Sequence, residues 1–486
     1  MVDFSATAPS GYFSPGRFDA EVLDCELRGT IPRDLDGAFY RMHLDWFYPP
    51  RFADEASLSA DGYISLFRFR GGVVDYRGRY VRTDRFEKQL AARKQLYGYY
   101  RNPYTDDAEV RNIANPGERT SANTTPIVLG GRLYATKEDG LPYRIDPNTL
   151  QTLGQEDFGG RWHSQTFTAH PKVDPQTGEL IAFGYEASGL AARDVFLCTF
   201  DKSGEMHTPM RFDVPHATML HDIAITRDHV IIPGGAAVTS LERLREGKIH
   251  WGWEAGRESF YGIVPRRGDP SGIRWFRGPE RSIVHTANAW SEGRKIYLDL
   301  PLADGNTWPF FPEIHGAPFK MHPNTIRRLT FDLDSGSDEC REERLFEQEV
   351  TSFTRIDDRF ATRPHRYIYV QYVDRSRRFR ATLPQDPRAL PTNSVARFDL
   401  QDGSMRSFFV GEAHVVQEPT FVPRAGGHAE GDGYLLATVH NLESMRCELV
   451  IVDAMELREL ARVLLPFRNP SQVHGLWATE QDLPLG

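Results

Sequence analysis

A strand–turn–strand pattern recurs along the chain and constrains its fold more than any other feature. Each copy is a β-rich run that ends in aspartate, followed by a turn rich in Asp, Asn, Ser or Gly and by a second short strand, which is typical of a hairpin. These aspartates lie 55, 131, 67 and 54 residues apart, at Asp146, Asp201, Asp332, Asp399 and Asp453. The interval of 131 is about two steps of 65, so we expect one degraded copy near Tyr261 to Trp275.

A repeat of about 60 residues built from strands and turns is typical of the radial blades of a β-propeller. About seven such units fit into the 486 residues once a leading arm of about 40 residues is set aside. We therefore predict an all-β, seven-bladed β-propeller with loops and short helices that cap its axis. One domain is expected over 1–486, with 1–40 as a leading arm packed on the propeller. Two stacked β-domains are the alternative.

One segment has helical rather than strand periodicity. Arg85 to Tyr100 reads RFEKQLAARKQLYGYY, which predicts a single helix outside the strand pattern.

Composition excludes several classes of protein. The net charge is −9, and acidic and basic residues are interspersed, which argues against a nucleic-acid-binding surface. No stretch approaches the roughly 18 apolar residues of a membrane-spanning helix. The N-terminal segment lacks the pattern of a signal peptide, and the four cysteines form no CxxC pair. We expect a soluble, cytoplasmic protein.

Four histidines follow a spacing close to that of the repeat. They lie 51, 64 and 189 residues apart, and 189 is three times 63; they are His170, His221, His285 and His474. Imidazole is a common ligand of transition metals, and the innermost strands of a propeller direct side chains towards the axis. The spacing predicts one shared metal site. Ordinary structural histidines remain the alternative, because some regular subset of 16 histidines arises by chance.

Two glutamates extend this series of histidines. Glu138 lies 32 residues before His170, and Glu418 lies 56 residues before His474. A carboxylate that accepts the second N–H of an imidazole fixes its tautomer and orientation. We expect both glutamates to act in this way.

Several segments in a fixed order resemble the carotenoid cleavage oxygenase family, and within it most closely the bacterial lignostilbene dioxygenases. The segments span nearly the whole chain and read GTIPRDLDGAFYR, YRNPYTDD, ATKEDGLPYRIDP, TAHPKVDPQTGEL, LHDIAIT, QEPTFVPR and QVHGLW. The resemblance implies a seven-bladed propeller. It also implies a mononuclear non-haem Fe(II), with His170, His221, His285 and His474 at the positions of the ligands.

The resemblance also identifies a departure beside the metal ligands. Glu138 and Glu418 match two of the three glutamates that orient the histidines in the family, but the third position falls on Ser352 in SFTRIDDRF. We expect Glu349 or a water molecule to replace the missing carboxylate, or one imidazole to be less firmly oriented.

Three further positions match residues near the substrate of the stilbene-cleaving members. Tyr104 and Lys137 match a pair that binds the 4-hydroxyl group of the substrate. Thr124 matches a threonine whose methyl group blocks one coordination position. The aromatic residue that usually stacks on the substrate ring, just before a GDG turn, is missing, since the segment ASLSADG has Leu58 nearby and no Phe. Without the resemblance, Tyr104 would be interpreted as a hydrogen-bonded structural residue, and Lys137 as part of a solvated pair with Glu138.

The implied function is an Fe(II)-dependent dioxygenase. Its substrates would be O₂ and a 4-hydroxylated stilbene, such as one derived from lignin, whose central C=C bond is cleaved to two aromatic aldehydes. A phenol has a pKa of about 10 in water, so the ammonium group of Lys137 and a hydrogen bond from Tyr104 would stabilise the phenolate. A homodimer is a further expectation, and no nucleic acid or transmembrane segment is expected.

Three alternative functions remain open at this point. The first is cleavage of an apocarotenoid, although a polyene leaves a buried ammonium group without a partner. The second is a non-catalytic propeller that serves as a binding scaffold, because a fold does not determine a function. The third is a Ca²⁺-dependent propeller hydrolase, which would need oxygen ligands rather than histidines.

Overall fold

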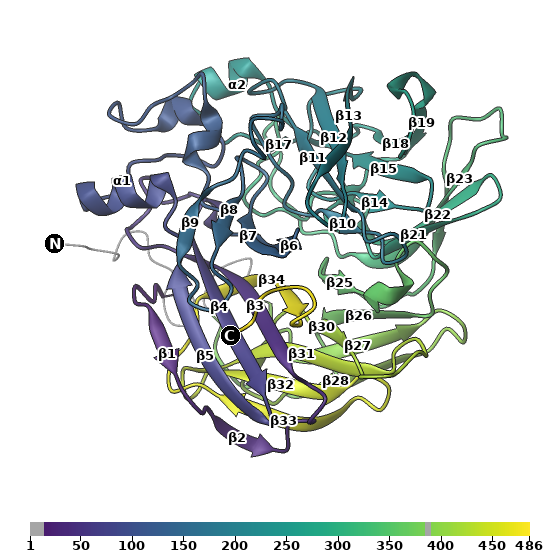
Figure 1. Ribbon diagram of the computed structural model, residues 1–486. Coiled ribbons are helices and arrows are strands. Elements are labelled where there is room, and N and C mark those ends of the chain that lie inside the picture. Colours follow the sequence, from purple (N-terminus) through teal and green to yellow (C-terminus); the bar gives the residue numbers. More distant parts are fainter. Residues whose placement is uncertain (1–13, 384–389) are drawn as a thin grey trace.

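The computed structural model describes residues 14–383 and 390–486. In this part of the chain, seven antiparallel sheets surround a central axis and form a seven-bladed β-propeller, as Figure 1 shows. The predicted fold class is confirmed. No helix in these two ranges is long and apolar enough to cross a membrane.

The first blade contains strands from both ends of the chain. Its strands, from the axis outwards, are β34 (Ser471–Ala478), β3 (Gly37–Asp45), β4 (Asp61–Arg70), β5 (Val73–Tyr80) and β1 (Ala20–Val22). The pairing of Ala38 with Ala478 joins β3 to β34, so the ring is closed by backbone hydrogen bonds between distant segments.

The next three blades follow the chain order. Blade 2 contains β6 (Thr125–Leu129), β7 (Arg132–Thr136), β8 (Tyr143–Ile145) and β9 (Thr152–Gln155). Blade 3 contains β10 (Lys172–Val173), β11 (Leu180–Tyr185), β12 (Asp194–Phe200) and β13 (Met206–Asp213). Blade 4 contains β14 (Ala224–Ile225), β15 (His229–Gly234), β18 (Ser259–Pro265) and β19 (Arg274–Gly278).

The last three blades complete the ring. Blade 5 contains β20 (Ser282–Ile283), β21 (Asn288–Glu292), β22 (Lys295–Ala303), β23 (Thr325–Asp332) and β24 (Arg341–Arg344). Blade 6 contains β25 (Thr354–Arg355), β26 (Tyr367–Tyr372), β27 (Ser394–Asp399) and β28 (Met405–Phe409). Blade 7 contains β29 (His414–Val416), β30 (Thr420–Pro423), β31 (Gly433–Asn441), β32 (Arg446–Asp453), β33 (Arg458–Leu464) and β2 (Glu26–Gly29).

The segment before β3 adds edge strands to two blades. β1 pairs with β5, and β2 pairs with β33. Residues 1–13 of the predicted leading arm lie outside the described residues, and the single-domain organisation stays a prediction.

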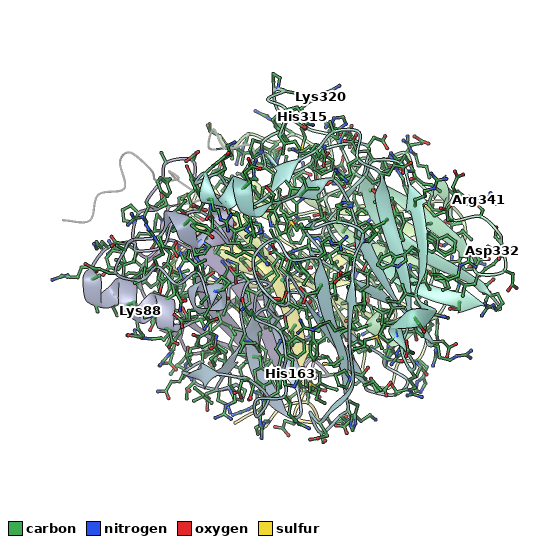
Figure 2. The ribbon with its side chains drawn as sticks, turned by 90° about the horizontal axis from the view of Figure 1, so that it is seen from above. Lys88, His163, His315, Lys320, Asp332 and Arg341 are labelled. Atoms are coloured by element: carbon green, nitrogen blue, oxygen red, sulfur yellow. The ribbon has the colours of Figure 1, made fainter. Side chains whose placement is uncertain are left out.

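Apolar side chains fill the spaces between neighbouring blades. Ile231 of blade 4 and Leu298 and Phe331 of blade 5 belong to one fully buried cluster. Charged side chains lie at the periphery instead, as Figure 2 shows for Lys88, Lys320, Asp332 and Arg341. Burial of apolar surface between the blades therefore holds the inner strands in fixed positions around the axis.

Short helices, short strands and loops form a cap, in the connection between blades 1 and 2 and in insertions within blades 1 and 4. The cap contains η2 (Ser57–Ser59), α1 (Asp84–Ala92), η3 (Pro103–Thr105), η4 (Pro116–Arg119), β16 (Ala237–Val238), α2 (Leu241–Arg245) and β17 (Gly252–Trp253). The amide of Asn102 donates to the carbonyl oxygens of Leu244 and Lys248, at 3.0 and 2.7 Å. These bonds join η3 to the region of α2. Two further 3₁₀ turns, η5 (Pro270–Gly272) and η6 (Asp358–Phe360), lie within blades 4 and 6.

The predicted helix from Arg85 to Tyr100 is too long at its C-terminal end. α1 begins after Thr83, whose hydroxyl accepts the N–H of Phe86, and ends before Arg93, which has a left-handed conformation with φ of 56°. Beyond it, the backbone N–H groups of Gly98 and Tyr100 donate to the carboxylates of Asp106 and Glu55, at 2.8 and 3.0 Å. The helix therefore ends at Ala92, and tertiary contacts decide the path of the chain after it.

Candidate metal centre

Four histidines from four blades meet at one point on the axis. His170 precedes β10, His221 precedes β14, His285 lies between β20 and β21, and His474 lies in β34. Their possible ligand atoms all lie within 4.8 Å of one another, and each residue is at most 9% exposed. The structure thus brings together the four residues that the spacing singled out.

The geometry of this four-histidine centre fits a transition metal. The Nε2 atom of His221 lies 3.0 Å from that of His170 and 3.2 Å from that of His285. Burial, reinforced by the neighbouring imidazoles, holds the pKa values of His170 and His285 well below their usual range. The rings are therefore neutral and present lone pairs to a shared point. Four nitrogen donors suit iron, zinc, copper or nickel rather than calcium, which excludes the calcium-dependent hydrolase.

Glu138 orients His221. Glu138 follows β7, and its Oε2 atom accepts the Nδ1–H of His221 at 2.5 Å. Its Oε1 atom accepts the hydroxyl of Tyr100 at 2.6 Å. Burial opposes ionisation of this carboxyl, but His221, Arg101 and Tyr100 together outweigh it and hold the pKa of Glu138 below its usual value. An ionised carboxylate thus orients His221 towards the point where the four imidazoles meet. The cap contacts the same carboxylate.

Glu418 orients His474 and is held by two arginines. Its Oε1 atom lies 2.9 Å from Nδ1 of His474 and 3.0 Å from Nε of Arg355. Arg41 donates to the other oxygen at 3.4 Å and to the backbone carbonyl of Glu418 at 3.1 Å. Burial favours the neutral carboxyl, yet Arg355 and His474 keep the pKa of Glu418 far below its usual value. The carboxylate is therefore ionised and fixed.

Among the described residues, His285 has no carboxylate partner of this kind. Its Nδ1 atom lies 3.0 Å from the backbone carbonyl oxygen of Ser352, which precedes β25. The expectation that Glu349 takes this place is wrong, because its side chain is 55% exposed and pairs with Arg375 at 2.9 Å. A backbone acceptor needs no particular side chain, so sequence reasoning could not identify it.

The link between Glu138 and His221 leads to the first prediction. Glu138→Gln is expected to lower the affinity for the metal by about 10–100-fold, because an amide is a weaker partner of the imidazole N–H than a carboxylate. Metal affinity is measured by competition with a chelator. Glu349→Gln is the control, since Glu349 lies outside the centre. An unchanged affinity in Glu138→Gln would contradict the assigned role.

Lys137 is buried next to Glu138, with its side chain directed into the cap. Its Nζ atom donates to the carbonyl oxygen of Leu58 and, at 2.9 Å, to the hydroxyl of Ser121, and it pairs with Asp139 at 3.4 Å. Burial lowers the pKa of Lys137 from 10.5 to about 8, although Asp139 acts in the opposite direction. Leu58, near the position where the resemblance places an aromatic residue, thus supplies a backbone acceptor to the lysine.

Tyr104 and Thr124 lie on separate segments of the same region. Tyr104 lies in η3, and its N–H donates to the side chain of Asn102 at 3.1 Å. Thr124 directly precedes β6, and its hydroxyl donates to Asn123 at 3.0 Å. No contact among the described residues assigns either side chain to a substrate or to a coordination position, so their roles stay predictions.

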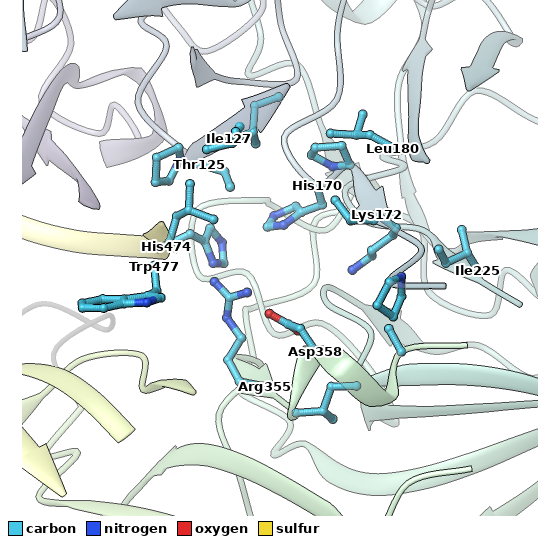
Figure 3. A pocket seen from close by; sticks show the side chains of 18 of the residues that line it. Thr125, Ile127, His170, Lys172, Leu180, Ile225, Arg355, Asp358, His474 and Trp477 are labelled. Atoms are coloured by element: carbon cyan, nitrogen blue, oxygen red, sulfur yellow. The ribbon is translucent and has the colours of Figure 1, made fainter. Parts of the chain in front are cut away.

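A cavity of about 750 Å³ reaches the centre from among the innermost strands. Figure 3 shows His170 and His474 directed into this inner-strand cavity, with Arg355 and Asp358 on the opposite wall and Lys172 at one side. Tyr104, Lys137 and Thr124 are not among its lining residues. The predicted phenol-binding residues therefore lie outside this cavity.

Aromatic side chains that the sequence reasoning missed surround the histidines. The ring centroid of Trp308 lies 6.1 Å from that of His221, and the centroid of Phe353 lies 5.0 Å from that of His285 and 5.2 Å from that of His474. Trp308 also contacts Phe310, with centroids 5.5 Å apart. The aromatic run TWPFF in a loop was the available signal, since exposed loops rarely carry so many large apolar residues.

Comparison with known proteins places this centre in a family. The model of the family described as retinal pigment epithelial membrane protein, to which the carotenoid cleavage oxygenases belong, matches residues 13–479. The chain belongs to this family. A carotenoid cleavage oxygenase relative from Sphingomonas paucimobilis, lignostilbene-alpha,beta-dioxygenase isozyme III, is 38% identical over 98% of both chains. Isoeugenol monooxygenase from Pseudomonas putida is 40% identical over 99% of this chain and 100% of its own.

A solved structure of a relative has the same fold as this carotenoid cleavage oxygenase. The crystal structure of Pseudomonas brassicacearum lignostilbene dioxygenase superimposes with a TM-score of 0.92 and 36% identity, and the match covers 97% of this chain and 98% of that one. The relatives are oxygenases by name, so the non-catalytic scaffold is the least supported alternative.

Proposed function

We propose that this carotenoid cleavage oxygenase uses Fe(II) and O₂ to cleave the central C=C bond of 4-hydroxylated stilbenes into two aromatic aldehydes. The observation that carries the proposal is the buried four-histidine centre beside a buried lysine. The names of the lignostilbene-cleaving relatives support the substrate class. Bound ferrous iron would supply activation of O₂.

The protein itself supplies the position and the charge state of the substrate. Lys137 would hold the 4-hydroxyl group as a phenolate, because its ammonium group lies in a buried environment where a charge pair is strong. Tyr104 would donate a second hydrogen bond to the same oxygen. Ionisation at this position pushes electron density through the ring to the para alkene, which makes the C=C bond the electron-rich group that O₂ attacks.

Neighbouring groups keep the centre ordered. Glu138 and Glu418 hold two imidazoles in place, and Thr124 would block one coordination position with its methyl group. Trp308 and Phe353 pack on the rings of the centre and would limit the access of water from their side. One side of the four-histidine centre would therefore accept an apolar alkene.

A phenol with a shorter para alkene is the second candidate substrate. Isoeugenol carries a propenyl group para to its hydroxyl, and isoeugenol monooxygenase is 40% identical to this chain. The same phenolate activation applies to it, so the proposal for Lys137 does not separate the two substrates. Cleavage of an apocarotenoid is less favoured, because a polyene offers no charge to a buried ammonium group.

A panel of substrates tests the proposal. The reconstituted protein should contain about one iron and convert a 4-hydroxystilbene to two aldehydes that are identified by mass. Blocking the phenol removes the activation, so the 4-methoxy analogue should react at least about 100-fold more slowly, in the range of a lost acid–base contribution. Equal rates for the two stilbenes would contradict the phenolate mechanism. Isoeugenol and an apocarotenal complete the panel.

Three finer expectations accompany this proposal. We propose that the stilbenes derive from lignin, that the protein is cytoplasmic, and that it forms a homodimer. Analytical ultracentrifugation measures the last of these.

A further inference from the structure

The three oriented imidazoles of the centre differ in the charge of their partners. His221 and His474 each donate from Nδ1 to an ionised carboxylate, whereas His285 donates to the backbone carbonyl of Ser352 at 3.0 Å. The same carbonyl also accepts the N–H of Thr354 at 3.0 Å. The partner of His285 is therefore neutral and shared.

No other carboxylate among the described residues takes over this role for His285. Glu349 is exposed and paired with Arg375. Asp222 lies close by, but its oxygens accept the N–H and hydroxyl of Thr286, at 2.8 and 3.0 Å, and pair with Lys172 at 2.8 Å. On its open face the His285 ring meets Phe353, which carries no charge.

The charge of an orienting partner changes what the imidazole gives to a metal. A carboxylate bound to the N–H raises the basicity of the opposite nitrogen, and hydrogen bonds to ionised acceptors are roughly twice as strong as neutral ones. Each such carboxylate also favours a more highly charged metal ion. Three imidazoles of this centre are oriented by a partner, but only two of these partners, Glu138 and Glu418, are carboxylates.

We propose that the Ser352 carbonyl is a neutral positioning group that makes His285 the weakest of the three oriented ligands and favours the divalent state of the metal. The backbone, not the serine hydroxyl, performs this role. The consequence for function is a resting centre that is oxidised slowly by O₂ before a substrate arrives. This inference rests on the proposed metal site, but not on the identity of the substrate.

Substitutions at Ser352 test the proposal by metal binding and redox behaviour. Ser352→Glu should bind Fe(II) and Co(II) about 10-fold more tightly in anaerobic chelator competition, by the lower end of the effect of such partners. It should also lower the reduction potential of the iron and speed its oxidation in air. Ser352→Ala should change none of these values, since the carbonyl remains. Ser352→Gln, which has the size of glutamate without its charge, should leave the potential unchanged.

A second comparison keeps the proposal testable if Ser352→Glu does not fold. His285→Ala should lose less affinity for Co(II) than His221→Ala, because the ligand with the neutral partner contributes less. Equal losses would contradict the proposal. So would a Ser352→Ala protein with an altered potential, or a folded Ser352→Glu protein with the affinity and potential of the unchanged chain.

These outcomes are distinguishable from a failure of the proposed function. A protein that shows the expected metal affinities but cleaves no phenolic alkene would contradict the proposed substrate and leave the role of Ser352 standing. A protein that cleaves the alkene, but whose Ser352 and His285 variants show none of these differences, would contradict the present inference alone.

Discussion

Replacing His221 with alanine is expected to remove metal binding and alkene cleavage together. His221 lies next to two other imidazoles of the centre, with Nε2 distances of 3.0 and 3.2 Å, and is directed to the metal point by Glu138. Loss of a ligand should exceed the roughly 100-fold upper effect of losing an orienting partner. Metal content per chain and aldehyde formation are measured on the same preparation.

A surface histidine provides the control for this experiment. His163 lies at the periphery of the body in Figure 2 and belongs to no part of the metal centre, so His163→Ala should retain both metal and activity. The melting temperature of each variant shows whether the propeller is intact. A folded His221→Ala protein that still carries one metal and cleaves its substrate would contradict the assignment of the centre.

The propeller could be predicted from the sequence because the same kind of turn residue recurs at each repeat. Asp146, Asp399 and Asp453 each accept backbone N–H groups from the turn that follows, as a hairpin of this kind requires. The copy expected to be degraded is a regular pair, β18 and β19, joined by a longer connection. A longer loop removes the turn signal without removing the strands.

Other parts of the fold depend on contacts between distant segments. The sequence cannot indicate that β34 closes the first blade, since the pairing of Ala38 with Ala478 has no local signature. The sequence also does not indicate the end of α1. Arg93 adopts the left-handed conformation there, whereas glycine or asparagine usually occupies such a position. Tertiary contacts such as that of Tyr100 with Glu55 decide the path there.

The candidate site was predictable where the chemistry requires a side chain. Histidines and glutamates near the inner strands are visible in the sequence, and the structure places Glu138 on His221 and Glu418 on His474. The spacing did not assign a histidine to Glu138, whose partner His221 precedes the first strand of blade 4. The acceptor for His285 is a carbonyl, which every residue carries.

The second large effect is expected at Lys137. Lys137→Met should lower kcat/KM for a 4-hydroxystilbene by about 10²–10⁴-fold, because the group that stabilises the phenolate is lost. The low activity on the 4-methoxy analogue should stay the same, since that substrate has no proton to lose. Lys88→Met is the control, because Lys88 lies on the outer side of α1 and is 46% exposed. Similar losses on both stilbenes would point to a structural role.

The pH dependence of this step follows from the pKa of Lys137, which burial lowers to about 8 in the free protein. The reactive complex contains the ammonium group of Lys137 and a phenolate. It therefore holds one proton fewer than a protonated lysine and a neutral phenol do before they bind. Below pH 8 a proton must therefore be released on binding, and kcat/KM falls as the pH decreases. Between pH 8 and the phenol pKa of about 10, the proton only moves from substrate to lysine, so kcat/KM is level.

Above pH 10 the free lysine and the free phenol have both lost their protons. The complex must then take up one proton from water to restore the ammonium group, so kcat/KM falls again. The lower of these two inflections belongs to the lysine and the upper one to the substrate. Lys137→Met should remove the inflection near pH 8 and keep the one near 10. An inflection near pH 8 that persists in the variant would assign that titration to another group and would leave the phenolate without the partner that the mechanism requires.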